Sequence, residues 1–299
     1  MRVGILGAES MHVEYFGIPI NREMLFGSAR VECIWGGDTT AKRLESCATE
    51  VGIEHIMNTP SEVIDNSDVV IITLRNGNLH AKYAIECMNK HKPLFIDKPF
   101  TCSTSDTLSI INAASQTGTP FTGGSTLCFL PEIQKLNKEN KQSPYTEISY
   151  RADPDSPYGG WFFYGSHLTD LCAAICGTDA TYVETKRSGS EVFVDVLYPY
   201  KMNWQTNSVE THNTNCRVNS EETKKVRLYS ALDLMYPKVT ISNTNILSDK
   251  ICYSCGLKAF FDIVASGISP DKERLMFSVR LMDAIMHSLT SGKVTAISR

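Results

Sequence analysis

The first 125 residues alternate short apolar runs with amphipathic stretches, which is the pattern expected of βαβ units. We predict strands over residues 2–6, 31–35, 69–73, 94–97 and 121–122, and helices over 40–51, 79–91 and 104–117. A capping box at Thr59-Pro60-Ser61-Glu62 begins a further helix. Because the strands are almost continuously apolar, we expect a parallel sheet covered on both faces, which is a doubly wound Rossmann domain.

The second half of the chain has a different pattern. A strand is predicted over residues 147–151 and several more over 182–246, with helices over 163–176, 256–266 and 271–291. Strands that follow one another directly indicate an open, mostly antiparallel sheet with helices on one face. We therefore expect an α/β chain with a Rossmann domain over residues 1–125 and a second α+β domain over 126–299. A second subunit is expected to cover the open sheet face, in a homodimer or homotetramer.

Composition narrows the class of protein. The 299 residues are 42% hydrophobic and 21% charged, as in globular chains, and the length favours two domains. A net charge of −4 without a basic run argues against a nucleic-acid partner. The apolar runs are too short to span a membrane and the N-terminus does not resemble a signal peptide, so we expect a cytoplasmic protein. Its ten scattered cysteines are interpreted as thiols.

The first strand runs into Gly7-Ala8-Glu9-Ser10-Met11-His12, the place of a dinucleotide-binding G-x-G-x-x-G turn, and only the first glycine is present. A carboxylate about 5 Å from a phosphate costs about 3 kcal/mol at an effective dielectric constant of about 20. We expect Glu9 to avoid this cost by pointing into solvent or by capping the helix amides. His12 either pushes the helix outward or is an ordinary packed histidine. The turn is predicted to bind phosphate weakly.

A ribose-binding acid is expected about 20 residues further on, at the end of the second strand. Trp35-Gly36-Gly37-Asp38 stands there, and Asp38 is the only acid within reach. Asp38 either binds the ribose, which would favour NAD, or simply leads into the helix that follows.

Lys98 and His167 are the candidate catalytic residues. Lys98 follows a parallel strand directly, and Pro99 biases it toward an extended backbone, so its ammonium is aimed out of the strand end where open sheets bind ligands. His167, in Gly165-Ser166-His167 with Asp170 one turn later, suits proton transfer near neutrality. Each alone has an ordinary structural alternative. Together they outline a cleft between the domains.

At these residues the chain resembles the glucose-fructose oxidoreductase/inositol dehydrogenase (Gfo/Idh/MocA) family. The resemblance rests on the turn at Gly7, the stretch around His80, Asp97-Lys98-Pro99 in place of Glu-Lys-Pro, the GSH-x-x-D of residues 165–170, and the closing helix. It implies a Rossmann domain, a C-terminal open-sheet domain that oligomerises, NAD or NADP as cofactor, and hydride transfer at a sugar or cyclitol hydroxyl carbon.

The resemblance also implies roles for residues. Lys98 and His167 match the family's catalytic lysine and histidine. The family often places an aspartate four residues before the histidine, where this chain has Phe163, and Tyr164 or Asp170 can partly replace it. The expected cofactor-binding residues are Gly7, Ala8, Glu9, Ser10, Asp38, Thr73, Leu74, His80, Asp97 and Lys98. Cys252 and Cys255 lack a second ligand pair, so no metal site is expected.

The sequence thus predicts an NAD(P)-dependent oxidoreductase for a sugar- or polyol-like substrate, in which His167 takes the hydroxyl proton and Lys98 stabilises the oxygen. Two alternatives remain open. One is a non-catalytic sugar or dinucleotide sensor on the same fold. The other is a lyase or hydrolase that oxidises its substrate transiently with a retained cofactor.

Overall fold

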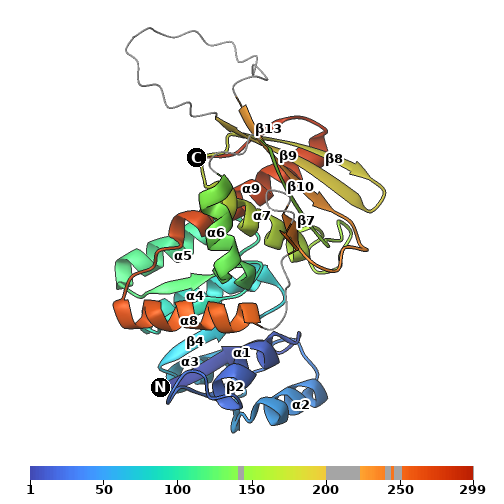
Figure 1. Cartoon of the computed structure of the whole chain (residues 1–299). Coiled ribbons are helices and arrows are strands. Elements are labelled where there is room, and N and C mark those ends of the chain that lie inside the picture. The colour runs from blue at the N-terminus through green and yellow to red at the C-terminus, as the bar shows by residue number, and fades with distance from the viewer. Residues whose placement is uncertain (141–144, 200–222, 240–243, 246–250, 299) are drawn as a thin grey trace, which may run out of the picture.

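The computed structural model describes residues 1–140, 145–199, 223–239, 244–245 and 251–298. Two sheets lie one above the other in the view of Figure 1, each with its own helices. The expected division at residue 125 stays a prediction. Within the described part of the chain, no helix is both long and apolar enough to cross a membrane.

The first sheet has six strands in the order β3-β2-β1-β4-β5-β6, and every pairing is parallel. Its strands are β1 Arg2–Leu6, β2 Arg30–Trp35, β3 His55–Ile56, β4 Val69–Ile72, β5 Leu94–Ile96 and β6 Phe121–Gly123. Its helices are α1 His12–Asn21, α2 Ala41–Val51, α3 Pro60–Asn66, α4 His80–Asn89 and α5 Thr104–Thr117, with the short 3₁₀ turns η1 Gly77–Leu79 and η2 Thr126–Phe129. The predicted Rossmann sheet is confirmed.

Local signals in the sequence explain the ends of these helices. The Thr40 hydroxyl accepts a hydrogen bond from the Arg43 amide at the start of α2, and Gly52 ends that helix with a left-handed backbone. The predicted capping box of Thr59 and Glu62 is formed at the start of α3. All four residues of β4 are buried, as a central strand covered on both faces requires.

The second sheet has the order β12-β11-β7-β10-β9-β8-β13. Its strands are β7 Tyr145–Tyr150, β8 Tyr182–Ser188, β9 Glu191–Pro199, β10 Thr223–Ser230, β11 Lys238–Val239, β12 Thr244–Asn245 and β13 Thr295–Ala296. Only the pair β7–β10 is parallel among the described strands, so the expectation of a mostly antiparallel sheet is confirmed. Part of the predicted strand run 182–246 lies outside the described residues.

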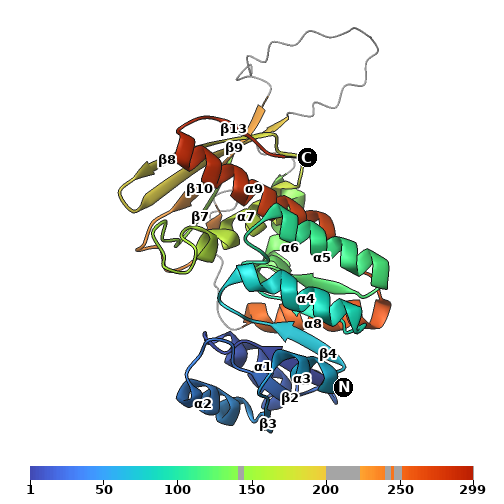
Figure 2. The same ribbon diagram turned by 180° about the vertical axis from the view of Figure 1, so that it is seen from behind.

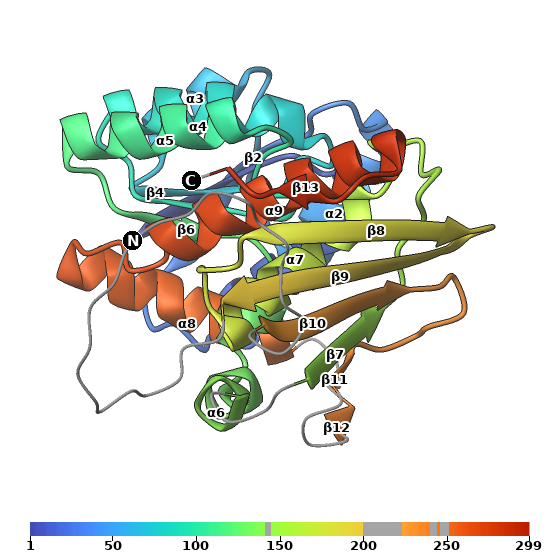
Figure 3. The same ribbon diagram turned by 90° about the horizontal axis from the view of Figure 1, so that it is seen from above.

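Helices cover one face of this second sheet. α7 Phe162–Cys176 and α9 Lys272–Ser291 pack against it, with α6 Pro131–Asn140 against α7 (Figure 3). Side chains of β9 alternate between buried and half-buried, with Val192, Val194 and Val196 facing the helices. The opposite face carries polar and aromatic side chains, including Asp195 and Phe193.

Helix α8, Ile251–Ser266, follows the second sheet in the chain but packs on the first. Leu257 and Phe260 are fully buried in the core of the Rossmann sheet, and the Phe260 ring lies against Phe95 of β5. Figure 2 shows α8 beside the N-terminal elements and α9 returning to the second sheet. The polypeptide therefore crosses between the two layers more than once.

Candidate active site

The turn after β1 keeps its first glycine for a steric reason. Gly7 has a φ of 108°, and a Cβ at this position would lie 2.6 Å from the backbone nitrogen of Leu74. The Gly7 amide donates to the Trp35 carbonyl at 2.8 Å, and the Thr73 hydroxyl donates to the Gly7 carbonyl at 2.8 Å. The strand-turn-helix that the sequence predicts is present, and it is fastened to the ends of β2 and β4.

Glu9 takes neither of the two expected orientations. Its carboxylate reaches sideways to the end of β2, where Oε1 accepts a hydrogen bond from the Asp38 amide at 3.3 Å. The Oε2 atom is buried and has no hydrogen-bond partner among the described residues. Burial raises the pKa of this carboxyl group above its ordinary value. The expectation of a solvated or helix-capping Glu9 is therefore wrong, because the two glycines at the end of β2 leave room for the side chain.

Two arginines that the sequence reading missed flank the same turn. Arg43 of α2 donates to the Ser10 carbonyl at 2.7 Å and pairs with the buried carboxylate of Glu14. Arg75, which follows β4, donates to the Glu9 carbonyl, and its guanidinium lies 4.4 Å from the centre of the Tyr158 ring. Both positive charges lie beside the backbone that would meet a diphosphate. They flank a turn in which Glu9 and His12 replace the second and third glycines of the fingerprint.

His12 connects the first turn to the end of β5. It is the first residue of α1, and its Nδ1 pairs with the carboxylate of Asp97, while its ring packs against Tyr15 and Tyr253. Burial raises the pKa of Asp97, but the facing His12 and Lys98 outweigh that effect and hold this pKa below its usual range. The third glycine position is thus occupied by a packed histidine that is part of the site.

Lys98 is almost completely buried at the end of β5, with 5% of its surface exposed. Its Nζ lies 4.2 Å from the centre of the Phe163 ring and 4.9 Å from that of Tyr164, both at the start of α7. Burial lowers the pKa of Lys98 to about 8, with Asp97 opposing this shift and Arg75 adding to it. An aromatic ring therefore faces the ammonium from Phe163, where the family often has a carboxylate.

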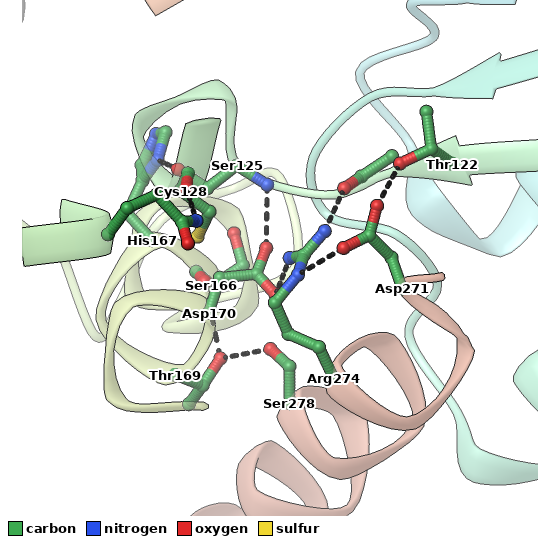
Figure 4. Close-up of polar contacts among 12 residues, drawn as sticks. Thr122, Ser125, Cys128, Ser166, His167, Thr169, Asp170, Asp271, Arg274 and Ser278 are labelled. Atoms are coloured by element: carbon green, nitrogen blue, oxygen red, sulfur yellow. Dashed lines mark hydrogen bonds and ion pairs between the residues drawn. The ribbon is translucent and has the colours of Figure 1, made fainter. Parts of the chain in front are cut away.

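His167 lies one turn after Phe163 and Tyr164 on α7. Its Nδ1 is 2.7 Å from the Ser125 hydroxyl (Figure 4). Its ring lies against the rings of Tyr150 and Tyr164. Burial lowers the pKa of His167 well below its ordinary value, and the positive charge of Lys98 adds to this effect. The Tyr164 ring thus lies against both His167 and the Lys98 ammonium.

Asp170 does not orient the imidazole directly. Its Oδ2 accepts from the Ser125 amide at 2.6 Å, and its Oδ1 is 3.2 Å from Nη1 of Arg274 (Figure 4). The hypothesis that Asp170 replaces the missing aspartate beside His167 is corrected to an indirect role, since it fixes the backbone of Ser125, whose hydroxyl meets the ring. Ser125 was missed because it lies in a loop 42 residues away in sequence.

His80 also has a structural position. It is fully buried, with Nδ1 3.1 Å from the Phe100 carbonyl and Nε2 2.8 Å from the Leu74 carbonyl. It joins the loops after β4 and β5 and does not line the groove as a cofactor ligand would. Two cavities lie beside the first turn. Four of the expected cofactor-binding residues line them, namely Glu9, Ser10, Asp38 and Lys98. The other six do not, namely Gly7, Ala8, Thr73, Leu74, His80 and Asp97.

Two adjoining cavities follow the carboxyl ends of the parallel strands and share Glu9, Arg75 and Tyr158. One, of about 560 Å³, includes Asp38 and Tyr158 in its wall. The other, of about 490 Å³, is lined by residues of the first turn and by Lys98, Phe163 and Tyr164. The residues present fit a dinucleotide, because the tight turn survives, two guanidiniums flank it, and the Glu9 carboxylate is directed toward β2.

The strand order 3-2-1-4-5-6 and the groove at the carboxyl ends of these strands define a Rossmann-type nucleotide-binding domain joined to an open-sheet domain. The Gfo/Idh/MocA model, described as an oxidoreductase family with an NAD-binding Rossmann fold, matches residues 1–124. The resemblance seen in the sequence is confirmed over residues 1–124, which match the NAD-binding Rossmann fold of this oxidoreductase family.

Two curated relatives are similar to part of this chain. The 2,7-anhydro-N-acetylneuraminate hydratase of Escherichia coli is 26% identical over 140 residues, which are 46% of this chain and 36% of the relative. The inositol 2-dehydrogenase of Rhodococcus erythropolis is 26% identical over 119 residues, which are 40% and 33% of the two chains. The matched region thus spans about a third of the length of these relatives.

Similarity to solved structures extends over the whole chain. The scyllo-inositol dehydrogenase of Lactobacillus casei, solved with NAD(H) and scyllo-inositol, has a TM-score of 0.76 at 10% identity and covers 100% of this chain and 99% of its own. A probable dehydrogenase of Thermotoga maritima has a TM-score of 0.72 at 17% identity, with 99% of both chains covered. At these identities the likeness establishes the fold of both domains.

Proposed function

We propose that this protein is an NAD(P)-dependent oxidoreductase that transfers hydride between nicotinamide and a hydroxyl-bearing carbon of a sugar- or cyclitol-like substrate. One observation carries the proposal: a buried ammonium that follows β5 and a buried imidazole on α7 both lie against the Tyr164 ring, and Lys98 and Tyr164 line the cavity that continues from the nucleotide turn. The family match of residues 1–124 and the dehydrogenase structures of the same fold support it.

The two groups have complementary protonation states near neutral pH. The lowered pKa of His167 keeps its imidazole neutral, so it can accept a proton, and the Ser125 hydroxyl beside Nδ1 leaves Nε2 for the substrate. Lys98, with a pKa of about 8, is still mostly protonated at pH 7 and can stabilise the developing charge on the substrate oxygen. The bound nicotinamide supplies the hydride acceptor.

The surroundings of these groups determine their chemistry. The Phe163 and Tyr164 rings exclude water from the Lys98 ammonium, which strengthens its field on a substrate oxygen. Asp97 partly balances the buried charge and is itself paired with His12. Arg43 and Arg75 would hold the diphosphate in place of the missing glycine contacts.

Calorimetry and absorbance test the proposal. Titration with NAD, NADH, NADP and NADPH should show binding of at least one of them below millimolar concentration. A panel of inositols, anhydrosugars and sugar acids should then reduce the oxidised cofactor, as seen in the absorbance of reduced nicotinamide. Absence of binding by all four would contradict the proposal and favour a sensor without dinucleotide.

A lyase or hydratase cycle is the second candidate, and the Escherichia coli hydratase among the relatives favours it. Such a cycle uses the same His167 and Lys98 to remove and return a proton while the cofactor is oxidised and reduced within one turnover. Substrate consumption without net accumulation of reduced cofactor would identify it. Net reduction in proportion to product would identify the dehydrogenase.

We also propose that two copies pair through the open face of the second sheet, in a cytoplasmic homodimer or homotetramer. This face carries the stacked pair Phe193 and Tyr229 and the ion pair of Arg227 with Asp195. Residues of this kind are frequent in subunit interfaces. Light scattering should show a dimer or tetramer, and substitution of Phe193 by aspartate should dissociate it.

A further inference from the structure

The end of β2 lacks the side chain that usually binds the adenosine ribose. In dinucleotide-binding sheets an acid near this strand end hydrogen-bonds the ribose hydroxyls. Here Trp35, the last residue of β2, is followed by Gly36 and Gly37, and the nearest acid along the chain is Asp38, which is further out on the surface. Asp38 does not cap α2 either, because Thr40 fills that position.

Glu9 brings a carboxylate to this place from the other side of the groove. Its Oε1 accepts from the Asp38 amide, and a side chain on Gly37 would overlap that oxygen. The glycines at the strand end therefore make room for a carboxylate that arrives from the first turn. This is a specific fit between two segments that are 29 residues apart in sequence.

The second oxygen of Glu9 is the remaining observation. Oε2 is buried and has no donor among the described residues, although burial disfavours the charged form of the group. Glu9 lines the cavity of about 560 Å³ together with Asp38, Asn78 and Tyr158. A cis-diol entering this cavity would give the unpaired oxygen the donor that it lacks.

We propose that Glu9 binds the adenosine ribose hydroxyls and thereby selects NAD over NADP; this inference depends on the oxidoreductase function proposed above. The carboxylate accepts hydrogen bonds from a 2′,3′-diol, whereas a 2′-phosphate would meet negative charge from Glu9. Two positive charges near the turn would attract a 2′-phosphate. Arg43 and Arg75 are less available for this contact, because their guanidiniums already donate hydrogen bonds to the carbonyls of Ser10 and Glu9.

This assignment can be tested without turnover. The dissociation constants of NADH and NADPH for the full chain are measured from the fluorescence of the two reduced cofactors. We expect the unmodified protein to bind NADH at least about tenfold more tightly than NADPH, since charged hydrogen bonds contribute about this factor. Glu9→Gln should weaken NADH binding by about tenfold and bring the ratio of the two dissociation constants close to one. Glu45→Gln, which removes an exposed charge from α2, is the matched control and should leave the ratio unchanged.

Three outcomes would overturn the assignment of Glu9. A ratio that is unchanged in Glu9→Gln and falls to about one in Asp38→Asn would assign ribose binding to Asp38. A Glu9→Gly variant that binds both cofactors more tightly would show that Glu9 only obstructs the turn. Equal or tighter binding of NADPH by the unmodified chain would show that Arg43 and Arg75, and not Glu9, determine the cofactor preference. If the unmodified chain binds neither cofactor, the oxidoreductase function fails together with the assignment, whereas the first three outcomes leave that function intact.

Discussion

The turns after β1 and after β5 both lie at the carboxyl-terminal edge of the parallel sheet. They depart from the family pattern to different degrees. The β5 turn keeps Lys98-Pro99 and changes only glutamate to Asp97. The β1 turn keeps only Gly7 of its three glycines. Despite this, the two turns are in direct contact, because His12 from the first pairs with Asp97 from the second.

The comparison shows that a poor match to a fingerprint can mark a rebuilt site. Glycines in such a turn let backbone amides approach a diphosphate. In this protein side chains lie around the turn instead. Glu9 contacts the end of β2 and His12 contacts the end of β5, while the guanidiniums of Arg43 and Arg75 approach from α2 and from the loop after β4. In the proposed mechanism the β5 turn supplies the ammonium that meets the substrate, and the β1 turn lies beside it.

Lys98→Met should produce the largest effect on activity. Methionine keeps the approximate length of the side chain but removes the charge that we propose stabilises the substrate oxygen. Loss of one such donor lowers kcat by about 10²–10³-fold. Steady-state kinetics should show this loss, while NADH binding by fluorescence stays within a few-fold of the unmodified protein. Retained turnover would show that Lys98 does not take part in the chemistry and would contradict the proposed mechanism, although the fold would be unaffected.

His12→Phe should mainly reduce stability. It leaves the buried carboxylate of Asp97 without its partner, which costs about 3 kcal/mol in comparable buried pairs. Urea unfolding at neutral pH measures this loss. The double variant with Asp97→Asn should recover part of it, because the uncompensated charge is gone. Equal stability of His12→Phe and the unmodified chain would show that the pair contributes nothing.

The same pair makes stability depend on pH in a defined direction. In the folded chain the pKa of Asp97 lies below its usual range. Its contribution to stability is therefore present at neutral pH and is lost as the pH falls through that lowered value. The difference between His12→Phe and the unmodified chain should shrink on acidification, and a constant difference would contradict this account.

The pH profile of kcat tests the roles proposed for Lys98 and His167. Because the pKa of Lys98 is lowered to about 8, activity should fall above pH 8 by about tenfold per pH unit as the ammonium is lost. His167 has a pKa well below its ordinary value, so no acidic loss of activity is expected near pH 6.5. An acidic limb at that pH would show that the imidazole is exposed to water during turnover.

Ser125→Ala should have the smallest of these effects. It removes the hydroxyl beside Nδ1 of His167, and loss of one such hydrogen bond corresponds to about 1 kcal/mol, or several-fold in kcat. Tyr164→Phe, which keeps the ring against both catalytic groups, should change kcat by less than Ser125→Ala. The reverse order would return the orienting role to Tyr164.

Much of the fold could be predicted from the sequence because its signals are local. Apolar runs, caps at Thr40 and Thr59, and the closing glycines locate most strands and helices of the first sheet within about two residues, whereas the short strand β3 and the bounds of α1 were not predicted. The return of α8 to that sheet could not be predicted, because an amphipathic helix does not specify which apolar surface it covers.

The candidate site divides in the same way. Lys98 was identified from a short motif that follows β5, and His167 from a short motif within α7. The positions of Ser125, Arg43 and Arg75, and the direction taken by Glu9, depend on contacts between segments that are distant in sequence. For example, Glu9 has room for its side chain because Gly37, at the end of β2, has none. Residues 7–12 alone do not reveal this.

The path of α8 has a practical consequence. Phe16 and Phe95 of the nucleotide-binding layer are covered by α8, which is encoded more than 120 residues downstream of β6. A fragment that ends near residue 125 would expose these rings to water and should aggregate. Excision of the nucleotide-binding half as an autonomous module, or its exchange between homologues, must therefore carry α8 along, by circular permutation or by grafting.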